Sequence, residues 1–171
     1  MPQGTTEWQG WSFTTMEFWT SADTQGREDF SLGEGVIAVA DPDEWDDYGS
    51  PASKGYFDSS LISPEVSVTG GQELYLGFAT HYQQEDNQTA QVIATFDNGQ
   101  QQTILKYDGN TASDNKGGHV LNKYETRKIQ VPQDAKTMQT KTKRIVMAMT
   151  AFSKKQRFND MMRENKSQRY E

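Results

Sequence analysis

The sequence predicts an all-β protein that folds as a single antiparallel β-sandwich. Short runs of apolar and aromatic residues, each of strand length, recur along the chain, and Gly, Asn, Asp and Pro separate them. Strands do not alternate with helical patterns and no internal repeat is present, so neither a parallel sheet nor a repeat fold is expected. A length of 171 residues suits one domain with a sizeable core.

Several segments carry the strand pattern. In chain order they are Gly35–Ala40, Glu73–Thr80, Ala90–Phe96, Gln102–Tyr107 and Thr126–Val131. Between the third and the fourth, Asn98 and Gly99 predict a hairpin with a type I′ turn, because both residues tolerate positive φ. Arg144–Phe152 has the length of a strand but contains residues that helices also accept, so its type stays open.

The C-terminal end differs from the rest of the chain in charge. The net charge is −7, but residues 1–135 hold 7 basic and 21 acidic residues, whereas residues 136–171 hold 10 basic and 3 acidic ones. We therefore divide the chain into a sandwich domain, residues 1–152, and a basic C-terminal extension, residues 153–171, which is a short helix or a solvated tail. Such a split indicates an electrostatic contact within the chain, with a neighbouring subunit or with an anionic partner.

Composition excludes several classes of protein. Aromatic residues make up 11% of the chain, which argues against general disorder. No apolar run approaches 18 residues, so neither a membrane helix nor a membrane partner is expected, and no signal peptide is recognised. The absence of cysteine excludes disulfides and thiolate metal sites. Nucleic acid is not expected as a partner, because the body is acidic and the basic end lacks interleaved aromatic residues.

Acidic side chains crowd behind the first apolar strand. The five carboxylates are Asp41, Asp43, Glu44, Asp46 and Asp47. Carboxylates spaced along a tight loop supply the hard oxygen ligands that Ca²⁺ requires. The EF-hand pattern fails, because Asp46 stands where that loop needs glycine. We expect a calcium site at the edge of the sandwich or, without a cation, a solvated acidic loop with Trp45 packed in the core.

Four residues are candidates for ligand binding. Trp45 and Tyr48 lie in the same polar loop, where aromatic rings can serve as a platform for a ligand. Glu85 and Asp86 follow one strand and precede another, so they can line the same end of the sheet as the acidic loop, although an ordinary polar turn has the same composition. The aromatic residues nearer the N-terminus are expected mainly in the core; they are Trp8, Trp11, Phe13, Phe18 and Trp19.

Catalysis is not expected. The two histidines, His81 and His119, share no recognisable metal spacing, and the nucleophile-elbow and zinc-protease motifs are absent. A carboxylate pair can hydrolyse glycosides, but among 24 acidic residues no pair stands out.

A family resemblance adds to these expectations. The blocks that carry it are Gly10–Phe13, Ala38–Asp47, Gly55–Val66, Glu85–Val92, Phe96–Gln100 and Ile104–Asp108. Their order resembles a β-sandwich module of large secreted proteins from environmental bacteria, which often accompanies metallophosphoesterase or other hydrolase domains. The resemblance implies a jelly-roll-like sandwich, similar in layout to carbohydrate-binding modules, which often hold a structural Ca²⁺, and it implies no catalytic activity. The C-terminal part diverges: it keeps Asn159 and Asp160 but lacks the family's final aromatic strand and terminal Asp-Asn, so the completeness of a metal site stays open.

Three functions are compatible with these observations. The first is a non-catalytic module that binds or attaches to a glycan or cell-surface polymer, with Ca²⁺ stabilising the 41–47 loop. The second is a structural assembly protein, such as a virion decoration or coat subunit, whose charged tail docks on a protein neighbour; an oligomer is possible. The third is an accessory domain of a secreted hydrolase. All three place the protein outside the cell or on the surface of a particle.

Overall fold

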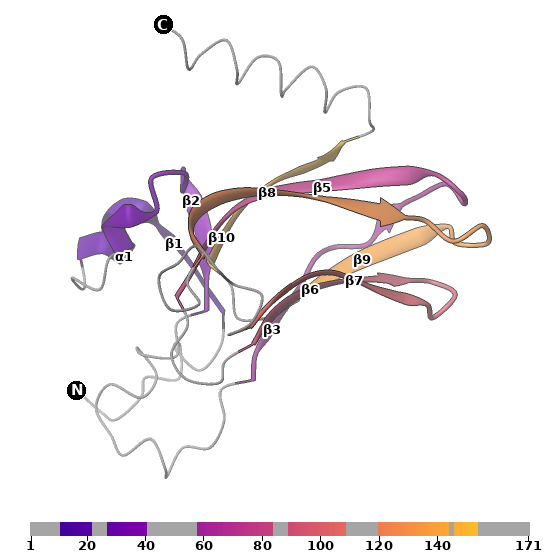
Figure 1. Cartoon of the computed structure of the whole chain (residues 1–171), viewed down its shortest axis with the longest axis horizontal. Helices are drawn as coiled ribbons and strands as arrows, with labels where there is room; N and C mark the ends of the chain where they lie inside the picture. The colour runs from indigo at the N-terminus through magenta and orange to yellow at the C-terminus, as the bar shows by residue number, and fades with distance from the viewer. Residues whose placement is uncertain are drawn as a thin grey trace, which may run out of the picture.

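The computed structural model describes residues 11–21, 27–40, 58–83, 89–108, 120–143 and 146–153, with the backbone alone for Leu121 and for residues 146–153 (Figure 1). The predicted extension, residues 153–171, lies outside this part of the chain except for its first residue.

The described residues form two antiparallel sheets, which confirms the all-β prediction. Sheet A has the order β1 (Ser12–Thr15), β2 (Val36–Val39), β10 (Val146–Ser153), β5 (Glu73–Tyr82) and β8 (Val120–Gln130). Sheet B has the order β3 (Ser60–Ile62), β9 (Thr137–Lys143), β6 (Ala90–Phe96) and β7 (Gln101–Tyr107), and β4 (Val66–Ser67) also pairs with β9. The described helices are short, α1 (Met16–Ser21) and the 3₁₀ turn η2 (Arg27–Asp29), and neither is long or apolar enough to cross a membrane.

The strand order is that of a jelly roll. The chain folds back on itself at the β6–β7 hairpin, and strands at increasing distance from that hairpin pair with one another: β6 with β7, β5 with β8, β3 and β4 with β9, and β2 with β10. Successive pairs alternate between sheet B and sheet A, and the pairings β5–β10 and β6–β9 join them laterally. This wrapped hairpin is the double Greek key that the resemblance implied.

The predicted strands are all present. Ala90–Phe96 has the predicted bounds, and β10 (Val146–Ser153) shows that the described part of Arg144–Phe152, whose type was left open, is a strand. Four strands were not predicted, namely β1, β3, β4 and β9. The first three are only two to four residues long. The fourth, β9, is central to sheet B, but its sequence TMQTKTK contains a single apolar residue and so lacks the alternation that marks a half-buried strand.

The hairpin between β6 and β7 forms, but the predicted turn type was wrong. A type I′ turn needs positive φ at both central residues, and here Gly99 has a φ of 83° whereas Asn98 does not have positive φ. The Gly99 N–H donates to the Phe96 carbonyl at 2.9 Å, and the Phe96 N–H donates to the Gln100 carbonyl at 3.0 Å. These bonds define a three-residue loop in which a type I turn is followed by a left-handed glycine.

Polar contacts with the turn at residues 134–136 explain why the loop has three residues rather than two. The Asp97 carboxylate accepts a hydrogen bond from the Lys136 backbone N–H at 3.0 Å, which lowers the pKa of Asp97. The Asn98 amide donates to Asp134 at 2.8 Å. Asp97 therefore belongs to the loop rather than to the strand, and the loop has one residue more than the dipeptide alone predicted.

Alternation along the strands fills the space between the sheets. From sheet A, Leu74, Leu76, Phe78 and Ile129 point inward. From sheet B, the inward residues of this cluster are Ala90, Val92, Ala94, Phe96, Leu105, Tyr107 and Met138. Because both sheets contribute, the main core is the interior of the sandwich.

A second, smaller core lies on the opposite face of sheet A. It contains Trp19, Phe30, Ile37, Val39 and Ala79. The first two belong to the connection between β1 and β2, of which residues 16–21 and 27–35 are described, so this connection packs over the outer face of sheet A near β2 and β5 (Figure 1).

The connection is tied to the opposite edge of the sheet as well. The Leu32 N–H donates to the side-chain oxygen of Asn122 at 2.7 Å, and the Asn122 amide donates to Ser31 at 2.6 Å. Asn122 lies in β8 at a register shift and has a left-handed φ of 47°. Asparagine tolerates that conformation better than most residues, so the irregular position in β8 serves as an anchor.

Candidate functional site

All nine site residues predicted from the sequence lie outside the described residues. They are Asp41, Asp43, Glu44, Trp45, Asp46, Asp47, Tyr48, Glu85 and Asp86. Within the described ranges, no group of three or more His, Asp or Glu residues is arranged to hold a metal ion. The calcium site therefore remains a prediction.

The strands that lead into these segments do end at the same place. Both β2 and β5 pair antiparallel with β10, so they run in the same direction. Ala38 of β2 and Thr80 of β5 stand opposite the same residue, Met147, and the two strands end shortly after it, at Val39 and Tyr82. The connections that carry the acidic residues and the Glu85–Asp86 pair consequently start from one end of sheet A.

A polar surface of the described chain is the outer face of sheet B. In β9, Met138, Thr140 and Thr142 are buried, so the intervening Gln139 and Lys141 face away from the core. The same alternation in β6 buries alanine, valine and phenylalanine and leaves Gln91, Ile93 and Thr95 outside.

The registers align these outward positions in rows across four strands. In the central row, Lys141 of β9 lies between Ile62 of β3 and Ile93 of β6, and Ile93 stands opposite Thr103 of β7. The neighbouring rows are Ser60, Lys143, Gln91 and Lys106 on one side and Gln139, Thr95 and Gln101 on the other. These eleven residues are called the sheet B outer face below.

This face is accessible. Ile62 is 56% exposed and the Lys106 side chain 49% exposed, and the central positions in β9 and β6 are half-buried by their neighbours. No described helix packs against sheet B, since α1 contacts β1 and η2. The face therefore presents amide, hydroxyl and ammonium groups around two isoleucines.

Two of the three lysines of the sheet B outer face form ion pairs with carboxylates at the margin of that face. Lys143 pairs with Asp58 at 2.9 Å, and Lys106 pairs with Asp108 at 2.9 Å. Lys141 has no ion-pair partner in the part of the chain that the structure describes. The amide, hydroxyl and ammonium groups of the eleven residues can hold a ligand by hydrogen bonds and charge.

A buried carboxylate lies at the β7–β8 edge. Glu125 is 4% exposed and accepts a hydrogen bond from the Tyr107 hydroxyl at 2.5 Å. It also pairs with Lys123 at 2.9 Å and with Arg127 at 2.7 Å. Burial, and then the Glu125 carboxylate, raise the pKa of Tyr107 above its usual value of 10.0. Because both oxygens of Glu125 are already bound, the cluster joins β7 of sheet B to β8 of sheet A and is not poised as a general base.

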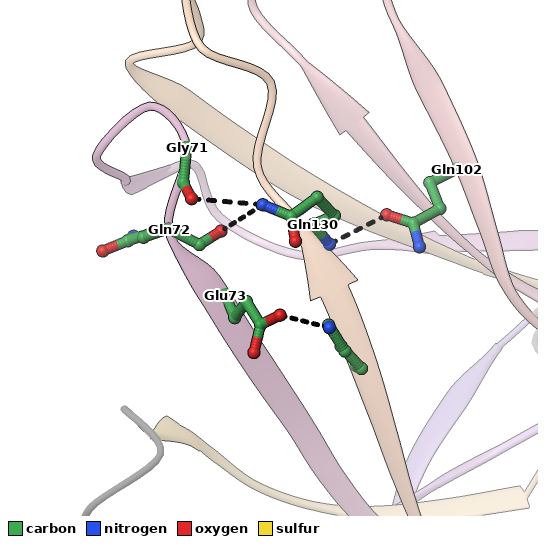
Figure 2. A network of polar contacts seen from close by, with 6 residues as sticks. Gly71, Gln72, Glu73, Gln102 and Gln130 are labelled. Atoms are coloured by element: carbon green, nitrogen blue, oxygen red, sulfur yellow. Dashed lines mark hydrogen bonds and ion pairs between the residues drawn. The ribbon is translucent and has the colours of Figure 1, made fainter.

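A second polar contact closes the same edge at the other end of the sandwich. The Gln130 backbone N–H donates to the Gln102 side-chain oxygen at 3.2 Å, and the Gln130 amide donates to the Gly71 carbonyl at 3.1 Å (Figure 2). Beside it, Lys128 forms an ion pair with Glu73. The two contacts together hold the edge strands of the two sheets side by side.

Comparisons with known proteins add little to this geometry. No protein-family model matches the chain, and no curated protein matches it. Among solved structures it is similar to a Clostridium thermocellum chain described as the N-terminal endo-1,4-beta-D-xylanase 10B CBM22-1-GH10 modules complexed with xylohexaose. The identity is 11% and the TM-score 0.30; the match covers 86% of this chain and 28% of the xylanase chain. A TM-score of that size identifies neither a family nor a function for this chain.

Sequence reasoning missed the sheet B outer face because it missed β9. The available signal was the alternation of threonine with Gln and Lys in TMQTKTK, in which threonine is the residue that suits a strand.

Proposed function

We propose that this chain is a non-catalytic binding or attachment module for a glycan or a cell-surface polymer, and that the sheet B outer face holds the ligand. The observation that carries the proposal is the alignment of outward Gln, Thr and Lys residues in rows across four strands, accessible and with no described helix over them. The proposed ligand places the protein outside a cell or on the surface of a particle.

The chemistry of the face suits a polymer of sugars. Each sugar hydroxyl both donates and accepts hydrogen bonds, and so do the Gln amides and the Thr hydroxyls. Ile93 and Ile62 offer apolar surface to the face of a sugar ring that presents its C–H groups. The rows form an open surface rather than an enclosed cleft, which favours an extended chain contacted at several points over a small molecule.

Binding to immobilised polysaccharides and to a glycan array tests this proposal. The double substitution Gln91→Ala with Gln139→Ala should reduce binding by the full chain at least tenfold, because each lost hydrogen bond contributes about 1 kcal/mol. Thr126→Ala, on the outer face of sheet A, is the matched control and should leave binding unchanged. Absence of any glycan ligand for the unsubstituted chain, or equal losses in both variants, would contradict the proposed site.

We also propose that Ca²⁺ binds the 41–47 loop. The support is the donor set, five carboxylates within seven positions, which is the ligand chemistry that Ca²⁺ prefers. A ligand that binds only the native state stabilises it, so excess chelator should lower the melting temperature, and Ca²⁺ in excess of the chelator should restore it. An unchanged melt in chelator would remove the calcium proposal without affecting the sheet B outer face.

A second candidate function is structural assembly, and three exposed apolar side chains favour it. Phe13 and Val36 are each 65% exposed at the β1–β2 edge, and Phe18 in α1 is 60% exposed. Large exposed apolar side chains often mark protein contacts. If the basic extension docks on a neighbouring copy, the full chain should form oligomers that dissociate with salt, and truncation after Phe152 should leave monomers. A full chain that is monomeric by light scattering at low salt would rule this function out.

A further inference from the structure

Lys141 occupies the centre of the sheet B outer face. It stands opposite Ile62 on one side and Ile93 on the other, so two apolar residues flank the stem that carries its ammonium group. Within the described chain no carboxylate lies within ion-pair distance of it. On a chain with a net charge of −7, this lysine is therefore a cation that no carboxylate of the described residues neutralises.

The two flanking lysines strengthen the positive charge of this region. Lys143 lies two residues further along β9, and Lys106 lies in the same row as Lys143, separated from it by Gln91. Their carboxylate partners are at the margin, and the Asp58 side chain is 66% exposed. Such exposed ion pairs are weak, so an anionic ligand can replace Asp58 beside Lys143.

The spacing of these cations suits a linear polyanion. Successive outward residues on one strand are about 7 Å apart, and neighbouring strands are about 4.8 Å apart. Lys141 and Lys143 are therefore separated by about 7 Å along β9, and Lys143 and Lys106 by about 10 Å across the sheet. Gln91, Gln139 and Thr95 lie between and beside them, where they can bind hydroxyl groups.

We infer that the polymer held by the sheet B outer face is an anionic polysaccharide, carrying carboxylate or sulfate groups, and that Lys141 selects it over a neutral one. This inference rests on the proposed function and names the class of its ligand. A polysaccharide is favoured over a single-stranded nucleic acid because the eleven residues of the face include no aromatic side chain on which bases can stack.

Polygalacturonate and its methyl ester provide a matched pair of probes, since they share one backbone and differ in charge. The full chain should bind polygalacturonate more tightly than the ester at 20 mM NaCl, and 200 mM NaCl should reduce the difference, because salt screens exposed charges. Lys141→Gln should weaken polygalacturonate binding about fivefold, which is the upper range for one exposed ion pair. Lys141→Arg should restore most of the affinity. Lys128→Gln removes one lysine from the outer face of sheet A and should have no effect.

The outcomes separate this inference from the function on which it rests. Equal affinity for both probes, unchanged in Lys141→Gln, would overturn the inference and leave a neutral glycan as the ligand of the same face. Single-stranded DNA bound as tightly as polygalacturonate, with the same loss in Lys141→Gln, would overturn it in favour of polyanions in general. If neither probe binds and the glycan array also finds no ligand, both the inference and the proposed function are wrong.

Discussion

The outer faces of the two sheets differ in what packs over them: the face of sheet A is partly covered by the β1–β2 connection, whereas no described helix covers the face of sheet B. On sheet A, the β1–β2 connection packs over Ile37, Val39 and Ala79, and it brings Trp19 and Phe30 to a core in which all five residues are at most 5% exposed. On sheet B, the outward residues are polar except for Ile62 and Ile93, and no described helix packs over them. The outer face of sheet A therefore contributes buried apolar contacts to stability, whereas the outer face of sheet B is the proposed ligand site.

Side-chain size on the central strands explains this difference. β5 of sheet A presents Gly77 and Ala79 outward, which lets other groups approach closely: a Cβ added at Gly77 would lie 2.5 Å from the Tyr124 hydroxyl. β9 of sheet B presents Gln and Lys, whose long side chains keep their polar ends in water. The covering segment packs on apolar residues of sheet A, Ile37, Val39 and Ala79, whereas β9 presents long polar residues on the outer face of sheet B.

The small core on the outer face of sheet A includes a buried charged residue, Arg27, whose guanidinium group contacts Trp19. Arg27 is 3% exposed, donates to the Trp19 carbonyl at 3.3 Å, and lies with its guanidinium carbon 5.4 Å from the centre of the Trp19 ring. The hydrogen bond and the cation–π contact both involve Trp19, so this residue joins α1, η2 and the sheet.

The largest expected effect comes from removing that tryptophan. Trp19→Ala should lower the free energy of unfolding by about 3–5 kcal/mol, as is usual for a buried aromatic residue. The neighbouring Phe18→Ala is the matched control: Phe18 belongs to the same helix but is 60% exposed, and its loss should change stability by less than about 0.5 kcal/mol. Urea denaturation measures both, and similar values for the two variants would show that the connection does not stabilise sheet A.

The two sheets are expected to unfold together. Tyr107 and Glu125 join their edges, so Tyr107→Phe should lower the free energy of unfolding by about 1.5–3 kcal/mol, the range for a hydrogen bond to a charged group. Fluorescence and far-UV circular dichroism should report one transition. Two separate transitions in the variant would mean that the sheets are independent units.

Alkaline pH provides an independent test of the same contact. The pKa of Tyr107 is raised in the folded protein, so above pH 10 the unfolded chain loses a proton that the folded protein keeps. The unfolded state then binds fewer protons, and the free energy of unfolding falls as the pH rises above 10, by up to about 1.4 kcal/mol per pH unit for this one group. Tyr107→Phe should remove that part of the pH dependence. An identical dependence in both proteins between pH 9 and 11 would contradict the assignment.

Sequence patterns predicted most strands of the fold but not the sheet B outer face, for physical reasons. The strands β5 and β6 bury apolar residues, so their runs identified them, and the Asn98-Gly99 turn located the hairpin even though its type was wrong. β9 buries Thr140 and Thr142, each 2% exposed, where the pattern of a strand leads one to expect Val or Ile. The face that β9 organises could not be predicted, because its rows depend on registers between strands far apart in the chain.

The aromatic residues near the N-terminus illustrate the same limit. They were expected mainly in the core, and Trp19 is buried and Trp11 packs against the main core, but Phe13 and Phe18 are 65% and 60% exposed. Trp8 lies outside the described residues. Hydrophobicity alone does not separate Phe18 from Trp19, because they are adjacent and only the direction in which α1 packs distinguishes them.

A smaller effect is expected from adding volume under the connection. Ala79 lies outward on β5, is 5% exposed and contacts the small core. Ala79→Val should destabilise the protein by about 1–3 kcal/mol, because added methyl groups in a packed site force neighbours to move. Thermal unfolding measures this change, and a neutral result would mean that the connection packs loosely enough to accept the larger side chain.

The smallest effect on stability is expected from the corresponding change on sheet B. Thr95 also lies outward on an internal strand, between Gln139 and Gln101, and Thr95→Val keeps its branched shape while it removes the hydroxyl. No described helix packs over this position, so the free energy of unfolding should change by less than about 0.5 kcal/mol. Polymer binding should nonetheless weaken, because a hydroxyl of the proposed site is lost. Ala79→Val should show the reverse pattern, with lower stability and unchanged binding, because it introduces valine at an equivalent position of the covered face. If Thr95→Val destabilises the protein as much as Ala79→Val does, something packs over the sheet B outer face, and that face is then no binding surface.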